Sequence, residues 1–142
     1  MKILKNSLFK NPGILLSTVL WLIAAHSIAM GLALIIQPDI LMEWSGFRSE
    51  YEHFFPAQGG VFHLLMAVAY IMGAINSKKY HYLIVFSIIV KAVATTFLIV
   101  YCITVEFKWT ILIFGFVDGV MGAMIFIALA YNLHFQRTYG NG

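Results

Sequence analysis

The chain has 142 residues, of which 61% are hydrophobic and only 11% are charged. A soluble domain carries roughly 25% charged residues, so these proportions exclude a water-soluble domain and predict an integral protein of the lipid bilayer. The net charge of +3 is too small and too scattered for nucleic-acid binding, and the single cysteine, Cys102, excludes an intramolecular disulfide or a CxxC redox pair.

Four stretches are apolar and long enough to cross a bilayer as helices of about 20 residues. In chain order, we expect these spans near residues 13–36, 57–76, 82–104 and 109–131. The first lies between Pro12 and Pro38, which favour helix boundaries because proline lacks an amide donor. It exceeds the roughly 7–15 apolar residues of a signal peptide, which favours a retained span. The predicted fold is an all-α four-helix transmembrane bundle, with residues 1–142 in a single domain.

Charges flank the spans unevenly. One side carries the basic residues Lys2, Lys5, Lys10, Lys78, Lys79 and Arg137. The other side carries Arg48 and Lys108 together with the acidic residues Asp39, Glu43, Glu50, Glu52 and Glu106. The positive-inside rule therefore predicts that the N and C termini are cytoplasmic, and we expect a bacterial inner membrane. For the outer loop, residues 38–56, we expect a short interfacial helix, with a lid over an outward-facing cavity or a docking surface for a partner as the alternatives.

Each span contains one ionisable residue: His26, His63, Lys91 and Asp118, in chain order. Such residues are costly in a membrane and normally face the bundle interior with a partner. A helical rise of about 1.5 Å per residue places three of them about 2–5 Å outward of their helix centres and Lys91 about 3 Å inward. The long, flexible Lys91 side chain can bring its ammonium group to the depth of the other three residues. We therefore predict one polar layer, with Lys91 paired to Asp118 across two consecutive antiparallel helices.

Helical spacing adds further candidates to this site. Tyr70 shares a face with His63, and Ser87 and Thr95 flank Lys91 at intervals of four residues. Small residues allow membrane helices to approach closely. We expect close helix packing at Gly59, Gly60, Gly115, Gly119 and Gly122. The last three are equally compatible with an interface to another chain.

Several functions fit a buried layer of this composition. The leading hypothesis is a non-enzymatic membrane protein that binds a small lipophilic ligand or handles protons, within a homo-oligomer or a larger membrane complex. One alternative is a membrane enzyme that applies acid–base chemistry to a lipid or quinone-like substrate, with His26 or His63 as the proton carrier. The other is a purely structural accessory subunit, in which the ion pair sets helix register.

No cofactor is predicted. His26, His63 and Asp118 have the composition of a two-histidine, one-carboxylate metal site, but Lys91 would repel a cation and no HxxxH or ExxH spacing is present. We therefore expect no metal. A b-type haem held axially by His26 and His63 is the remaining cofactor alternative.

Two stretches, AHSIAMGLALIIQP and PAQGGVFHLLMAVAYIMG, have the glycine placement of small membrane helix bundles. With the length and the four spans, they give the chain an architecture that resembles the DoxX-like proteins over most of its length. The resemblance implies a four-helix membrane fold. That family is functionally diverse, so the resemblance assigns no active residue.

Overall fold

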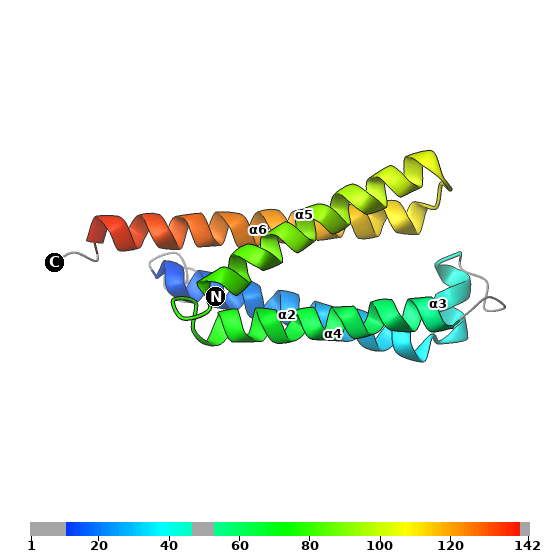
Figure 1. The fold of residues 1–142 in the computed structure, drawn as a ribbon, viewed down its shortest axis with the longest axis horizontal. Helices are drawn as coiled ribbons and strands as arrows, with labels where there is room; N and C mark the ends of the chain where they lie inside the picture. Colours follow the sequence, from blue (N-terminus) through cyan, green and yellow to red (C-terminus); the bar gives the residue numbers. More distant parts are fainter. Residues whose placement is uncertain (1–10, 47–52, 140–142) are drawn as a thin grey trace, which may run out of the picture.

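The structure is a computed structural model that describes residues 11–46 and 53–139. Within these residues it consists of helices joined by short connections. The helices are α2 (Pro12–Ile36), α3 (Asp39–Trp44), α4 (Phe54–Ile75), α5 (His81–Thr104) and α6 (Trp109–Tyr139) (Figure 1). The four long helices are apolar and long enough to cross a membrane. The all-α four-helix bundle predicted from the sequence is therefore confirmed.

Local sequence signals set both ends of α2. The Asn11 side chain caps the first turn by accepting a hydrogen bond from the Gly13 amide at 3.2 Å, and Pro12 occupies the first helical position, where no amide donor is needed. At the other end Gln37 adopts a left-handed conformation (φ 49°), and its amide donates to the Ala33 carbonyl at 2.9 Å. Pro38 follows and prevents the helix from continuing.

The last helix is longer than the sequence predicted. We expected the fourth span to end near residue 131, where the apolar run gives way to polar residues, but α6 continues to Tyr139. No glycine or proline interrupts residues 123–139, so the backbone has no reason to leave the helix. A change in polarity therefore marks the end of the apolar span and not the end of the helix.

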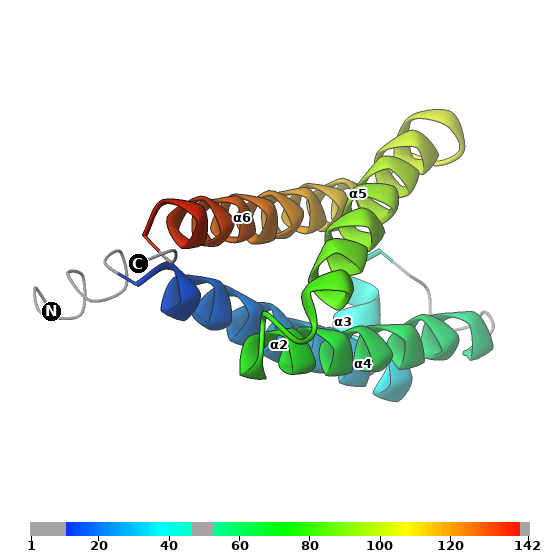
Figure 2. The same ribbon diagram turned by 60° about the vertical axis from the view of Figure 1, so that its left-hand side comes forward.

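The long helices form two antiparallel hairpins. The first hairpin is α2 with α4, and the second is α5 with α6. They pack on each other chiefly through α2 and α6, and α4 and α5 share less contact. Figures 1 and 2 show the hairpins diverging toward one end of the molecule, which holds α3 and the α5–α6 turn and is called here the α3 end. The other is called the Asn11 end.

A pair of glycines brings the two helices of the first hairpin into close contact. A Cβ atom added to Gly60 would lie 2.6 Å from the Gly31 carbonyl oxygen, and one added to Gly31 would lie 2.9 Å from the Gly60 carbonyl. The neighbouring Gly59 differs, because its added Cβ would meet only Leu34, at an ordinary 3.9 Å. The close approach thus depends on Gly60 and on Gly31, which the sequence analysis did not single out.

The glycines of α6 face α5 within the same chain. Added Cβ atoms would lie 3.2 Å from Leu98 at Gly115, 3.2 Å from Thr95 at Gly119 and 3.1 Å from Lys91 at Gly122. These distances are tight for real side chains. The glycine stripe therefore serves packing inside the second hairpin.

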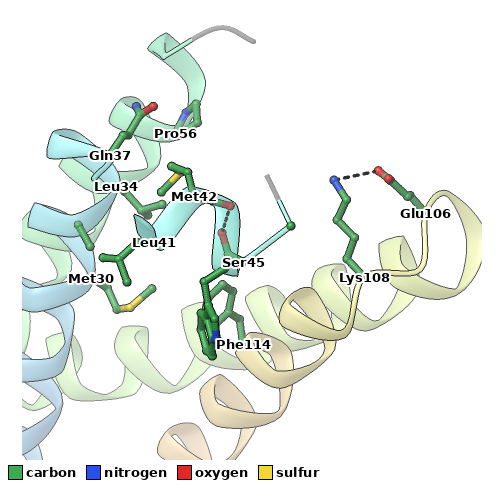
Figure 3. A pocket seen from close by; sticks show the side chains of 13 residues that line it. Met30, Leu34, Gln37, Leu41, Met42, Ser45, Pro56, Glu106, Lys108 and Phe114 are labelled. Atoms are coloured by element: carbon green, nitrogen blue, oxygen red, sulfur yellow. Dashed lines mark hydrogen bonds and ion pairs between the residues drawn. The ribbon is translucent and has the colours of Figure 1, made fainter. Parts of the chain in front are cut away.

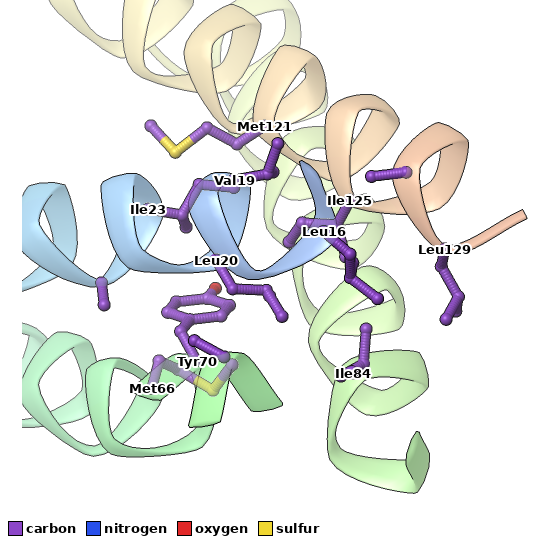
Figure 4. Packing of buried hydrophobic residues seen from close by; sticks show 13 residues of the cluster. Leu16, Val19, Leu20, Ile23, Met66, Tyr70, Ile84, Met121, Ile125 and Leu129 are labelled. Carbon is purple, nitrogen blue, oxygen red and sulfur yellow. The ribbon is translucent and has the colours of Figure 1, made fainter. Parts of the chain in front are cut away.

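The apolar core lies in the half of the molecule near the Asn11 end, and Figure 4 shows how its side chains pack. All four long helices contribute to it, and its buried members are Leu16, Val19, Leu20, Ile23, Ala24, Met66, Tyr70, Ala74, Ile84, Met121, Ile125, Ala128 and Leu129. This set is called the aliphatic plug below. It holds the two hairpins together where they lie closest.

The predicted outer loop contains a short helix, α3, at its start. Residues 47–52, including Arg48, Glu50 and Glu52, lie outside the described residues. α3 is attached to the second hairpin, because the buried Thr110 hydroxyl donates to the Ser45 carbonyl at 2.9 Å and the Trp44 and Trp109 rings meet edge to face at 5.0 Å. α3 therefore bridges the two hairpins at the end where they diverge.

Candidate functional site

Lys91 and Asp118 pair inside the second hairpin. Lys91 is only 3% exposed, and the Asp118 side chain is 14% exposed. The Lys91 Cβ packs against Gly122, one helical turn nearer the Asn11 end than Asp118, so the lysine stem extends along α6 to bring its ammonium group to the carboxylate. Each charge thus has an opposite charge as its partner, which buried charges require.

The two histidines approach this pair from the first hairpin. His26 on α2 and His63 on α4 both lie close enough to interact electrostatically with Lys91 and with Asp118, and His63 also with His26. Among the described residues, no hydrogen bond joins either imidazole to the pair. The four residues therefore interact electrostatically across the contact between the two hairpins. This set is called the polar layer below.

The other candidate residues lie in different surroundings. Tyr70 is buried in the aliphatic plug and is close enough to Asp118 to interact with it electrostatically. The Ser87 hydroxyl donates to the carbonyl of Leu83 in its own helix at 2.7 Å. The Thr95 hydroxyl is also buried, yet it has no hydrogen-bond partner within residues 11–46 and 53–139. Ser87 and Thr95, which flank Lys91 symmetrically in the sequence, are therefore not equivalent.

Ser27 belongs with these residues and was not among the predicted site residues. It is fully buried, and within the described part of the chain its hydroxyl has no partner. The only sequence signal was a hydroxyl residue directly after His26 in an apolar helix. Serine is common on helices and usually bonds its own backbone, so that signal did not distinguish it.

The polar layer separates two different halves of the molecule. Every buried residue of the aliphatic plug lies on the Asn11 side of the ionisable residue in its own helix. On the α3 side, where the hairpins diverge, the structure contains a cavity of about 730 Å³. The layer thus has closely packed hydrocarbon on one side and open space on the other.

The cavity lies beneath α3 and between the hairpins (Figure 3). Its lining is mainly apolar and comes from α2, α3, the start of α4 and the first turns of α6; it includes Met30, Leu34, Leu41, Met42 and Phe114. Polar residues lie at its outer edge: Gln37, Glu106 and Lys108. Apolar walls with a few polar groups are typical of small-molecule sites in proteins.

Hydrogen bonds hold the outer edge of the cavity in place. The Gln37 amide nitrogen donates to the His53 carbonyl at 2.8 Å, and the Gln37 amide oxygen lies 2.7 Å from His53 Nδ1. These two contacts join the end of α2 to the start of α4. On the opposite edge, Lys108 Nζ lies 3.4 Å from a Glu106 carboxylate oxygen.

The inner end of the cavity lies one helical turn from the polar layer. Met30 lines the cavity and follows His26 by four residues on α2, while Phe114 lines it and precedes Asp118 by four residues on α6. Four residues correspond to a rise of about 6 Å. The cavity and the polar layer are therefore neighbours along the bundle axis.

The metal-site alternative considered from the sequence is not assembled. Within residues 11–46 and 53–139, no group of three His, Cys, Asp or Glu side chains is placed to hold a metal ion. Lys91 is paired with Asp118, and its ammonium group would repel a cation at that position.

No family model, curated protein or solved structure matches this chain. The resemblance to DoxX-like proteins stays a prediction from architecture. What the chain does is therefore inferred from the cavity and the polar layer themselves.

Proposed function

We propose that this small integral membrane protein binds a lipophilic small molecule in the cavity at the α3 end. The observation that carries this proposal is the cavity itself, about 730 Å³ between the helices of a membrane bundle. Ligand pockets typically measure about 300–1,000 Å³ and often lie between the helices of bundles. The bilayer supplies lipophilic molecules directly to such a site.

The lining favours an amphiphilic ligand. Met30, Leu34 and Phe114 provide an apolar surface for the body of the ligand, and methionine adapts its shape to different partners. Gln37 and Lys108 lie at the outer edge, where a polar group of the ligand would find hydrogen-bond partners and a charge. The ligand would therefore bind with its polar group toward the membrane surface at the α3 end.

Tryptophan fluorescence tests the proposal, because Trp44 lines the cavity and contacts Trp109. The protein is purified in mild detergent as the Trp21→Phe variant, which removes the exposed tryptophan in the other half of α2. A dibrominated fatty acid, which quenches indole fluorescence on contact, is then titrated in. We expect saturable quenching at about one equivalent of the probe.

A cavity-filling substitution separates binding from random collisions within the micelle. Ala33 lines the cavity, so Ala33→Phe should abolish the saturable component. Ala25 is exposed on the same helix and lies outside the cavity, so Ala25→Phe should leave that component unchanged. Quenching that increases linearly with probe concentration, and equally in both variants, would contradict a binding site.

We also propose an orientation for the protein in the membrane. Lys78, Lys79 and Arg137 lie at the Asn11 end, and Asp39 and Glu43 lie at the α3 end. The positive-inside rule then favours a cytoplasmic Asn11 end. In a bacterial inner membrane, the cavity would face the periplasmic side.

A further inference from the structure

Two buried hydroxyl groups in the spans have no protein partner within the described residues: those of Ser27 and Thr95. Other hydroxyls in the same helices behave differently, because Ser87 and Thr96 donate to backbone carbonyls four residues earlier. Buried polar groups are nearly always hydrogen-bonded, and where the protein offers no partner the usual partner is an ordered water molecule. These two hydroxyls therefore point to internal water.

Both hydroxyls lie within one helical turn of an ionisable residue of the polar layer, one in each hairpin. Ser27 directly follows His26 on α2. Thr95 lies one helical turn toward the α3 end from Lys91, and it packs against Gly119, the neighbour of Asp118. The inner end of the cavity, at Met30 and Phe114, lies about one further turn away.

On the opposite side of the polar layer lies the aliphatic plug, whose buried side chains are all apolar except for the Tyr70 hydroxyl. Ser87 lies one turn from Lys91 toward the Asn11 end, and its hydroxyl already has a hydrogen-bond partner within its own helix, unlike those of Ser27 and Thr95. Leu16, Leu20 and Ile125 of the aliphatic plug are buried and have no polar side-chain atom that would bind water. An apolar region packed this closely excludes water.

We propose that Ser27 and Thr95 hold ordered water that connects the polar layer to the cavity, so that Lys91 and Asp118 exchange protons with the α3 side of the membrane only. The titratable groups of the first hairpin that interact electrostatically with the pair are His26 on α2 and His63 and Tyr70 on α4. A proton from the α3 side passes along the water to this cluster and returns by the same route. This half-channel is a site for water and protons that opens into the cavity, so it conducts protons while the inner end of the cavity, at Met30 and Phe114, is not filled by the lipophilic ligand proposed above.

Cysteine reactivity at two matched positions tests the proposal. Thr95→Cys and Ser87→Cys are made separately in the full chain with Cys102→Ala, and each new thiol lies four residues from Lys91 on the same helix. The protein is placed in lipid nanodiscs and treated with a small water-soluble methanethiosulfonate. The thiolate is the reactive form and needs water, so we expect modification at position 95 to be at least tenfold faster than at position 87.

Sealed vesicles add the direction of access. In vesicles of known protein orientation, the reagent should modify Thr95→Cys only when it is added on the α3 side. Equal rates at the two positions, no reaction at position 95, or access from the Asn11 side would each overturn the proposal. Circular dichroism establishes that both variants keep their helices before the rates are compared.

A second measurement uses the unsubstituted protein. X-ray hydroxyl-radical footprinting oxidises side chains next to water, and methionine oxidises readily. Met30 lies at the inner end of the cavity, and Met121 lies across the polar layer in the aliphatic plug. We expect oxidation of Met30 to be at least several-fold faster than that of Met121, and similar rates at the two residues would overturn the one-sided path.

Discussion

At the scale of single residues, the stability of the bundle depends on charges that compensate each other. Lys91 and Asp118 are both largely buried, so removing one partner leaves the other charge unpaired in a medium that solvates it poorly. Glu106 and Lys108 form a second pair, but the Glu106 side chain is 55% exposed and stays solvated. The buried Lys91–Asp118 ion pair therefore contributes more to the stability of the protein than the exposed Glu106–Lys108 pair.

We expect Asp118→Asn to reduce the free energy of unfolding by about 3–5 kcal/mol, the usual cost of breaking a buried pair. Glu106→Gln should change it by at most about 1 kcal/mol, as for exposed pairs. Denaturant-induced unfolding in detergent, followed by circular dichroism, measures both. The double variant Lys91→Met/Asp118→Asn should recover part of the loss. Equal effects of the two single substitutions would show that the buried pair carries no special weight.

At the scale of helices, close approach depends on single backbone positions. Gly59 and Gly60 are consecutive glycines on α4, so the residue type does not distinguish them. Only Gly60 lies against the backbone of α2 at Gly31. Within the second hairpin, Gly122 makes room in the same way for Lys91. The close spacing of α5 and α6 at Gly122 therefore determines where the Lys91 side chain lies between these two helices.

We expect Gly60→Ala to destabilise the protein by about 1–3 kcal/mol, because the new methyl group would collide with the backbone of α2. Gly59→Ala has room for its methyl group and removes a flexible residue from a helix, so it should be neutral or stabilise by up to about 1 kcal/mol. Thermal unfolding in detergent, with the two variants side by side, provides the measurement. If both variants behave alike, the close approach at Gly31 does not hold the first hairpin together.

At the scale of the whole molecule, the polar layer lies between a closely packed half and a half with a cavity. This asymmetry matters only if the protein has a defined direction in the membrane. The lysines of the α4–α5 connection, Lys78 and Lys79, and the acidic residues around α3 favour one direction.

We expect a reporter fused after Tyr139 to be cytoplasmic, so that green fluorescent protein fluoresces there and alkaline phosphatase is inactive. A phosphatase fused after Glu106, beyond the third span, should be active, because that turn lies at the α3 end. The opposite pattern would reverse the orientation, and the half-channel would then open toward the cytoplasm.

The amino-acid sequence by itself determined the four spans and the placement of one ionisable residue in each. Both follow from local properties: apolar runs need to be about 20 residues long to span the bilayer, and the helical rise fixes the depth of each residue. The sequence therefore also indicated which ionisable residues lie at similar depth.

Only the tertiary structure decided how the two hairpins diverge, and therefore where the cavity lies. It also distinguished Gly60 from Gly59 and Thr95 from Ser87, and it added Gly31 and Ser27. These differences depend on which surface of a neighbouring helix each residue meets. Helices that are apolar on nearly every face carry little periodic signal for that choice, so the packing of the assembled bundle decides it.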